Sequence, residues 1–234
     1  MDDRLTAIQV CGLWKSFGDQ VVLRGIDLTV PAGEGVALVG ANGSGKSTLL
    51  RCLASVLRPQ AGEVRWFGRA ARGNLAVRRL IGLVAHESFL YPHLTLRENL
   101  LFAARMCDVP EPGARADELL RRTGLERHAR RLPGETSAGM QRRVSLARAL
   151  VHEPPILLLD EPFAGLDAQG TAWLFDLLST RRSRGGTLVF ATHDLAHARR
   201  LADRVLELRM GRLQEAEMGR GDVWGDGPPL ARAA

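Results

Sequence analysis

The chain has 234 residues, of which 45% are hydrophobic, enough to build the core of one domain. No run approaches the roughly 18 consecutive apolar residues of a membrane span. The N-terminal MDDRLTAIQV begins with acids rather than with the basic and then apolar segments of a secretory signal. We therefore expect a cytoplasmic protein, whose role at a membrane, if it has one, runs through a partner.

The distribution of charge argues against a nucleic-acid-binding protein, and the spacing of the cysteines argues against a protein built on disulfides or a metal cluster. The net charge is +6, but it comes almost entirely from arginines that are spread along the chain and are not interleaved with aromatic residues. A groove for single-stranded nucleic acid would combine the two, so we favour solvated faces and expect no nucleic-acid partner. Cys11, Cys52 and Cys107 lie far apart without CxxC spacing, which argues against a disulfide framework or a metal cluster.

The N-terminal part is rich in β-forming segments. Ile8–Trp14 and Val21–Val30 are two of them, and Gly18-Asp19 between them is a typical turn pair. A third segment, Glu63–Phe67, follows further along the chain. Together these segments predict an antiparallel β portion beside the main sheet.

Short apolar runs alternate with helical runs in the rest of the chain. Strands are expected at VALV (Val36–Val39), IGLV (Ile81–Val84), ILLLD (Ile156–Asp160), TLVFA (Thr187–Ala191) and RVLEL (Arg204–Leu208). Helices are expected over residues 47–57, 95–106, 114–124 and 173–182. The alternation predicts an α/β fold with a mostly parallel core sheet, whose strands are buried on both faces.

The middle of the chain is helix-rich and is expected to form a separate helical lobe over about residues 95–150. Its first helix begins at Thr95, and Glu98 three residues later completes the pattern of a capping box. The segment 216–234 is rich in glycine and proline and is expected to be a loosely ordered tail. The single domain is therefore expected to span residues 5–215.

The segment GANGSGKST, Gly40–Thr48, matches the phosphate-loop pattern G-x-x-x-x-G-K-[ST] between a predicted strand and a predicted helix. Its glycines let successive backbone N–H groups point at phosphate oxygens, and the helix start adds its positive dipole end. We expect Lys46 to reach the β- and γ-phosphates and the Ser47 hydroxyl to bind Mg²⁺. The expected nucleotide-binding residues of the loop are Asn42, Gly43, Ser44, Gly45, Lys46, Ser47 and Thr48.

Two acids and a histidine follow buried strands. Asp160 ends ILLLD and is expected to bind the metal, while Glu161 is expected to polarise the attacking water. His193 follows TLVFA, and parallel strands can bring it to the same edge, where it could bond the γ-phosphate. Alone, Glu161 would more simply be a solvated loop acid and His193 a structural histidine. Asp194 is expected to cap the next helix.

Together these motifs resemble the nucleotide-binding subunits of ATP-binding-cassette (ABC) transporters, over about residues 8–213. GANGSGKST is similar to the family's Walker A loop, ILLLDE to its Walker B strand with the catalytic glutamate, and THD to the segment with its switch histidine. The resemblance implies a P-loop NTPase fold with a RecA-like core and an antiparallel β subdomain, and it implies ATP and Mg²⁺ as cofactors. It also places Phe17 against adenine and Asp167, in AGLD, in the D-loop.

The segment Glu135–Arg143, ETSAGMQRR, lies where the family has its signature motif LSGGQ. Ser137 and Gly139 match that motif, whereas the residues at 136, 138 and 140 depart from it. The chemistry requires a hydroxyl and close backbone N–H groups at a helix start, facing a γ-phosphate. Ser137 as a helix cap still meets that requirement.

The second departure is His86, which stands where the family has a glutamine that senses Mg²⁺ and the membrane partner. Imidazole can donate or accept a hydrogen bond, so contact with water or metal remains open. His86, SAGMQRR and EPFAGLD together resemble one branch, the ATP-binding subunits of haem exporters in cytochrome c biogenesis. Subunits of drug and lipid exporters share much of this pattern.

The resemblance implies an ATPase that lies on the inner face of the cell membrane and drives an integral membrane permease. A second nucleotide-binding subunit, expected to be an identical copy, would pair with it head to tail. A soluble ABC ATPase of translation or DNA repair is the alternative, but those proteins carry two cassettes or long coiled coils. A GTPase is disfavoured because the chain has no N-K-x-D motif, and a cassette that only binds nucleotide is hard to reconcile with Lys46, Asp160, Glu161 and His193.

Overall fold

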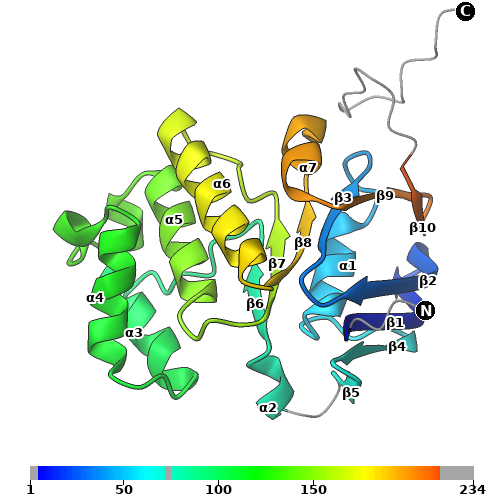
Figure 1. The fold of residues 1–234 in the computed structure, drawn as a ribbon, viewed down its shortest axis with the longest axis horizontal. Helices are drawn as coiled ribbons and strands as arrows, with labels where there is room; N and C mark the ends of the chain where they lie inside the picture. The colour runs from blue at the N-terminus through cyan, green and yellow to red at the C-terminus, as the bar shows by residue number, and fades with distance from the viewer. Residues whose placement is uncertain (1–4, 72–74, 217–234) are drawn as a thin grey trace, which may run out of the picture.

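The computed structural model describes residues 5–71 and 75–216, which form two sheets and a helical lobe (Figure 1). The predicted tail lies outside the described residues except for Ala216. The strands are β1 (Thr6–Phe17), β2 (Gln20–Pro31), β3 (Gly35–Val39), β4 (Ala61–Trp66), β5 (Arg69–Ala70), β6 (Ile81–Val84), β7 (Ile156–Asp160), β8 (Thr187–Ala191), β9 (Arg204–Arg209) and β10 (Arg212–Glu215). The α-helices are α1 (Lys46–Leu53), α2 (Leu75–Arg78), α3 (Leu96–Met106), α4 (Pro112–Arg122), α5 (Ala138–Ala149), α6 (Ala168–Ser183) and α7 (Leu195–Leu201).

The core sheet has six strands in the order β10-β9-β3-β8-β7-β6. All pairs in it are parallel except β9 with β10. Every residue of β3, β7 and β8 is buried, because helices cover both faces of a parallel sheet. The predicted α/β fold with a mostly parallel core sheet is therefore confirmed.

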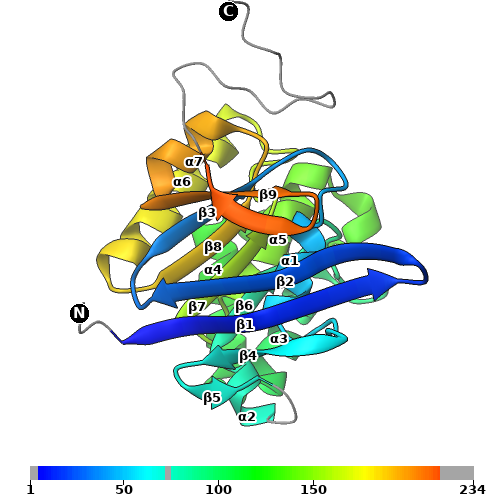
Figure 2. The same ribbon diagram turned by 90° about the vertical axis from the view of Figure 1, so that its right-hand side faces the viewer.

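The second sheet is antiparallel and has the order β2-β1-β4-β5. The predicted turn at Gly18-Asp19 joins its two long strands, which Figure 2 shows crossing in front of the core sheet. Apolar side chains of this sheet, of α1 and of the core sheet form one continuous hydrophobic cluster. The buried Trp66 adds a polar anchor, since its Nε1 donates to the Leu53 carbonyl at 3.0 Å. Helix α1 is thus held between the two sheets.

Helices α3, α4 and α5 form the predicted helical lobe around their own apolar cluster. Thr95 caps α3 as expected: its hydroxyl accepts from the Glu98 N–H, and the Glu98 carboxylate accepts from the Thr95 N–H at 2.8 Å. An ion pair joins α3 to α4, with Arg97 Nε 2.6 Å from Asp117 Oδ1. No described helix has both the length and the apolar character to cross a membrane.

Some element boundaries differ from those predicted. The helix expected over residues 47–57 ends at Leu53, because Ser55 adopts a left-handed backbone with φ of 56°. Helix α6 begins at Ala168, earlier than the apolar run from Trp173 indicated, because Asp167 caps it. The short elements α2, β5 and β10 were not predicted, since each is too brief to show a period.

The parallel register decides where the chemistry-bearing loops emerge. Ala191, at the end of β8, is paired with Leu38 of β3 on one side and with Asp160 of β7 on the other. The three strands therefore end at the same level, at the carboxyl edge of the sheet. The loops that follow them begin side by side.

Candidate functional site

The loop between β3 and α1 has a backbone that only glycine can adopt at several positions. Gly40, Gly43 and Gly45 have φ values of 140°, 75° and 108°. A Cβ atom on Gly40 would lie 2.5 Å from the carbonyl oxygen of Leu208, and one on Gly45 would lie 2.8 Å from a methyl group of Val22. The glycines thus permit both the turn and the close packing beneath it.

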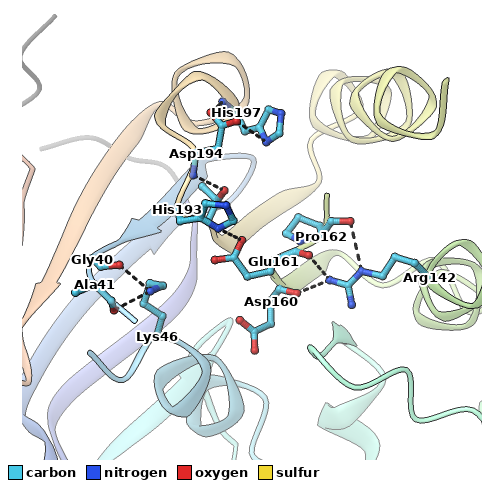
Figure 3. Close-up of polar contacts among 11 residues, drawn as sticks. Gly40, Ala41, Lys46, Arg142, Asp160, Glu161, Pro162, His193, Asp194 and His197 are labelled. Carbon is cyan, nitrogen blue, oxygen red and sulfur yellow. Dashed lines mark hydrogen bonds and ion pairs between the residues drawn. The ribbon is translucent and has the colours of Figure 1, made fainter. Parts of the chain in front are cut away.

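Lys46 is the first residue of α1, and its side chain turns back over the loop (Figure 3). Its Nζ donates to the carbonyls of Gly40 at 2.8 Å and Ala41 at 3.1 Å. Burial lowers the pKa of the ammonium group, while the nearby charges of Glu161 and Asp160 raise it. The lysine is therefore held between the glycine loop and two carboxylates.

A cavity of about 320 Å³ lies in front of this loop and joins segments that are far apart in the sequence. Its lining residues are Val22, Asn42, Gly43, Gly45, Lys46, Ser47, Thr48, His86, Asp160 and Glu161. Beside it, the buried hydroxyl of Ser44 makes no hydrogen bond within the described residues. An oxyanion in the loop would supply the missing partner. The structure thus brings the predicted phosphate, metal and catalytic residues together.

Glu161 and His193 face one another from the loops that follow the neighbouring strands β7 and β8 (Figure 3). His193 Nδ1 lies 3.0 Å from Glu161 Oε2. Glu161 has a left-handed backbone with φ of 45°, and its N–H donates to the carbonyl of Ala191 at 3.0 Å. Asp194 caps α7, as expected, by accepting from the N–H groups of Ala196 and His197. The register of β7 with β8 therefore brings the predicted acid and histidine into contact.

Of the predicted site residues that do not line this cavity, three lie at the starts of α5 and α6. Ser137 is exposed and caps α5, with its hydroxyl accepting from the Met140 N–H at 3.3 Å. Gly139 is packed so closely that a Cβ on it would lie 3.0 Å from the Gly165 carbonyl. Asp167 is exposed and caps α6. Within one chain, none of the three is brought to the phosphate loop.

Phe17 and His86 lie at the margins of the cavity. Phe17 is 51% exposed at the end of β1, with the Lys15 ammonium 5.0 Å from its ring centroid, and it does not line the cavity. His86 is exposed and lines both this cavity and a second one of about 300 Å³ beside α5 and Gly165. It therefore stands between the phosphate loop and the signature segment.

The ABC transporter family model matches residues 23–164 of this sequence. The chain belongs to the ABC transporter family. A dimeric ATP-binding cassette, solved in a post-hydrolysis state with ADP and Pi, superposes with a TM-score of 0.81 at 30% identity, covering 89% of this chain and 98% of that one. The ATP-binding subunits of this family are ATPases coupled to transport, which confirms the expectation of an ATPase at the level of the family.

Two curated relatives differ in what they transport. The Fe(3+) ions import ATP-binding protein of Rhodococcus jostii is 40% identical over 89% of this chain. The Nod factor export ATP-binding protein I of a Rhizobium species is 40% identical over 88%. The chain spans 61% and 69% of the lengths of these two relatives. One imports and the other exports, and neither supports the haem-exporter branch that the sequence suggested.

The oxygen donors of the cassette fit Mg²⁺. The Ser47 hydroxyl and the Asp160 carboxylate line the same cavity, and Mg²⁺ is typically held by one or two protein oxygens together with phosphates and water. Among the described residues, no group of three or more His, Cys, Asp and Glu side chains could hold a metal ion by itself. His86 shares the cavity, but an imidazole nitrogen suits Mg²⁺ poorly.

One residue at this site was missed from the sequence. Arg142, one of the two arginines that end ETSAGMQRR, is buried and reaches the backbone of Asp160, Glu161 and Pro162 (Figure 3). Its neighbour Arg143 instead donates to the Thr123 carbonyl in the helical lobe. A pattern of charges in the sequence does not separate the two, because the difference depends on which face of α5 meets β7.

Gly45→Ala tests the loop geometry. The added methyl would meet Val22 and would require a backbone conformation that alanine rarely adopts, so we expect destabilisation of about 1–3 kcal/mol. Affinity for a fluorescent ATP analogue should fall at least about tenfold, measured by equilibrium titration. The control is Gly68→Ala, whose φ is 74° with open space around the Cβ, and which should keep wild-type affinity. Wild-type affinity in Gly45→Ala would contradict the assignment of this loop.

Proposed function

We propose that this chain binds and hydrolyses ATP to power an integral membrane permease, and that it works as a pair of identical cassettes. The observation that carries the proposal is the convergence of Lys46, Ser47, Asp160 and Glu161 on one cavity. His193 adds to it through its contact with the Glu161 carboxylate. A structural lysine and solvated acids would have no reason to share a cavity with a glycine loop.

The phosphates of ATP would lie on the glycine loop at the start of α1. Lys46 would exchange its bonds to the carbonyls of Gly40 and Ala41 for bonds to phosphate oxygens. Mg²⁺, held through Ser47 and Asp160, would neutralise charge on the phosphates. Phe17, exposed at the end of β1, offers a ring on which adenine can stack.

Glu161 would orient the attacking water and accept its proton. The carboxylate is half-buried at the mouth of the cavity, where a positioned base is more effective than in bulk water. His193, bonded to that carboxylate through Nδ1, would present its other nitrogen to the γ-phosphate. In this arrangement the transferred phosphoryl group meets positive or donor groups from Lys46 and His193.

The exposed helix starts are the reason for proposing a second copy. Ser137 and Asp167 cap α5 and α6 at the surface of the chain. Neither residue lines the cavity in front of the phosphate loop of its own chain. In a head-to-tail pair, the Ser137 hydroxyl and the first N–H groups of α5 would face the γ-phosphate held by the other copy. ATP would then join the two chains, and hydrolysis would release them.

The segment that follows β6 is the proposed contact with the permease. Phe89 and Tyr91 are 43% and 47% exposed, and the Tyr91 ring packs edge-on against Phe102 of α3 with centroids 5.0 Å apart. Buried Asn99 holds this segment by accepting from the Tyr91 N–H at 2.7 Å and donating to the Leu94 carbonyl at 2.9 Å. A rigid, partly apolar surface next to His86 can transmit closure of the pair to helices of a partner on the inner face of the membrane.

For the cargo, the sequence favours haem export, because of His86 and the unusual residues of the signature segment. The two relatives named above, an iron importer and a Nod factor exporter, do not support that choice. We keep haem export as the specific hypothesis and a drug or lipid exporter as its alternative.

Co-purification of a tagged chain from membranes of its source organism tests the partner and the cargo. We expect an integral membrane permease to be recovered and, for the haem branch, one from the cytochrome c maturation apparatus. A different permease would overturn the haem branch. Recovery of ribosomes or of DNA-repair proteins without a permease would favour a non-transport ATPase instead.

Glu161→Gln tests the catalytic role. The amide cannot take a proton from water, so we expect kcat for ATP hydrolysis to fall at least about a hundredfold while ATP still binds. The bound ATP should then hold two chains together, which size-exclusion chromatography with ATP would show as a dimer. Glu63→Gln, an exposed acid on β4, is the control and should behave as wild type. Normal hydrolysis, or a monomer with ATP, would refute this mechanism.

Ser137→Arg tests the contact across the pair. Ser137 is exposed, so a larger side chain fits within one chain, but it would lie against the nucleotide of the other copy. We expect hydrolysis to be abolished while ATP binding by the monomer is unchanged, measured by titration with a fluorescent analogue. Ser183→Arg, at the exposed end of α6, is the matched control. Equal loss of binding and hydrolysis would mean that Ser137 has only a structural role.

A further inference from the structure

Arg142 of α5 is the most heavily bonded buried cation near the site. Its Nη1 donates to the Ala85 carbonyl at 2.6 Å, and its Nη2 donates to the carbonyls of Asp160 and Glu161. Its Nε makes a longer contact of 3.4 Å with the Pro162 carbonyl. Only 7% of the residue is exposed. One guanidinium group thus contacts two separate segments of backbone.

These bonds go to carbonyls rather than to carboxylates. Burial lowers the pKa of the Arg142 guanidinium, and the nearby charges of Asp160 and Glu161 act in the opposite direction. A buried charge is costly unless its donors are satisfied, and here the planar fork of the guanidinium matches several carbonyls at once. The arrangement therefore holds backbone, not side chains.

Arg142 bonds to a stretch of backbone that includes a residue in an unfavourable conformation. Glu161 is left-handed at φ of 45°, a conformation that residues other than glycine seldom adopt. Its N–H is fixed by the Ala191 carbonyl, and its own carbonyl accepts from the Ala164 N–H at 3.1 Å as well as from Arg142. This turn aims the Glu161 carboxylate at His193 and into the phosphate cavity (Figure 3).

Arg142 lies on α5, the helix that begins within the signature segment Glu135–Arg143. Ser137 caps α5, and Arg142 projects from the same helix, so the two are joined by continuous helical backbone. The bond to Ala85 adds the residue directly before His86. The Arg142 side chain therefore connects the helix that Ser137 caps with the backbone next to His86 and with the turn at Glu161.

Resting on the proposed function, we propose that Arg142 is a positioning residue that holds Glu161 in its catalytic turn and makes that turn depend on the position of α5. A movement of α5, caused when Ser137 engages the nucleotide of the other copy, would shift the guanidinium and with it the Glu161 backbone. The cassette would thus orient its own catalytic acid only when its signature helix is engaged.

The test compares Arg142→Met with Arg142→Lys in the full chain. Both should keep the affinity for a fluorescent ATP analogue within about twofold, because neither variant alters the phosphate loop. Both should lower kcat for ATP hydrolysis by about ten- to a hundredfold, the loss expected when a catalytic group is misplaced by about 1 Å. Lysine carries the charge but lacks the planar guanidinium group that donates to several carbonyls at once, so Arg142→Lys should not restore the rate.

Arg115→Met is the matched control. Arg115 is also largely buried and also donates to backbone carbonyls, those of Leu150 and Val151 at the far end of α5, each at 3.0 Å. Its loss should lower the melting temperature, read by circular dichroism, as much as the loss of Arg142, while kcat stays within about twofold of wild type. Assays are run well below both melting temperatures, so that folded protein is compared with folded protein.

The outcomes separate this inference from the proposed function. If wild type hydrolyses ATP and Glu161→Gln does not, the proposed function stands. A wild-type kcat in either Arg142 variant, or an equal loss in Arg115→Met, would then overturn only the role of Arg142. If Arg142→Met does not fold, Arg142→Lys decides alone. If wild type shows no ATP hydrolysis, the proposed function itself fails.

Discussion

The parallel register of β3, β8 and β7 is the constraint on which the rest of this structure depends. Ala191 is paired with Leu38 on one side and with Asp160 on the other, so three loops leave the sheet at one level. Those loops carry the glycines predicted to bind phosphate, the two acids and the histidine. A shift of one residue in any strand would turn its side chains to the opposite face and separate the groups.

Around this rigid sheet, the site is built from backbone that is locally unfavourable. The glycine loop has positive φ at Gly40, Gly43 and Gly45, and Glu161 shares that region without being glycine. Buried strands on both sides stabilise these conformations, because their hydrophobic contacts outweigh a few kcal/mol of local strain. The strained backbone at the carboxyl edge of the sheet is therefore stable because the strands that hold it are well packed.

In the proposed pair, the helical lobe supplies the part of the site that a single chain does not complete. Its helix α5 is capped by the exposed Ser137 and is attached to the catalytic turn by the buried Arg142. One end of the helix therefore meets solvent or a second copy, while its body meets β7. In the proposed pair, this attachment would link the nucleotide that Ser137 contacts to Glu161, which acts on the nucleotide of its own chain.

The sequence by itself determined the α/β class, the glycine loop, the acids, the histidine and the caps at Thr95, Ser137 and Asp194, because each depends on residues close together in the chain. Helix ends were less certain, since Ser55 and Asp167 override the apolar period. Only the tertiary structure decided that the Glu161 and His193 side chains touch, that Phe17 lies outside the cavity and that Arg142, not Arg143, meets the catalytic turn. These facts depend on which strands are neighbours and which face of a helix is buried, and no local pattern encodes either.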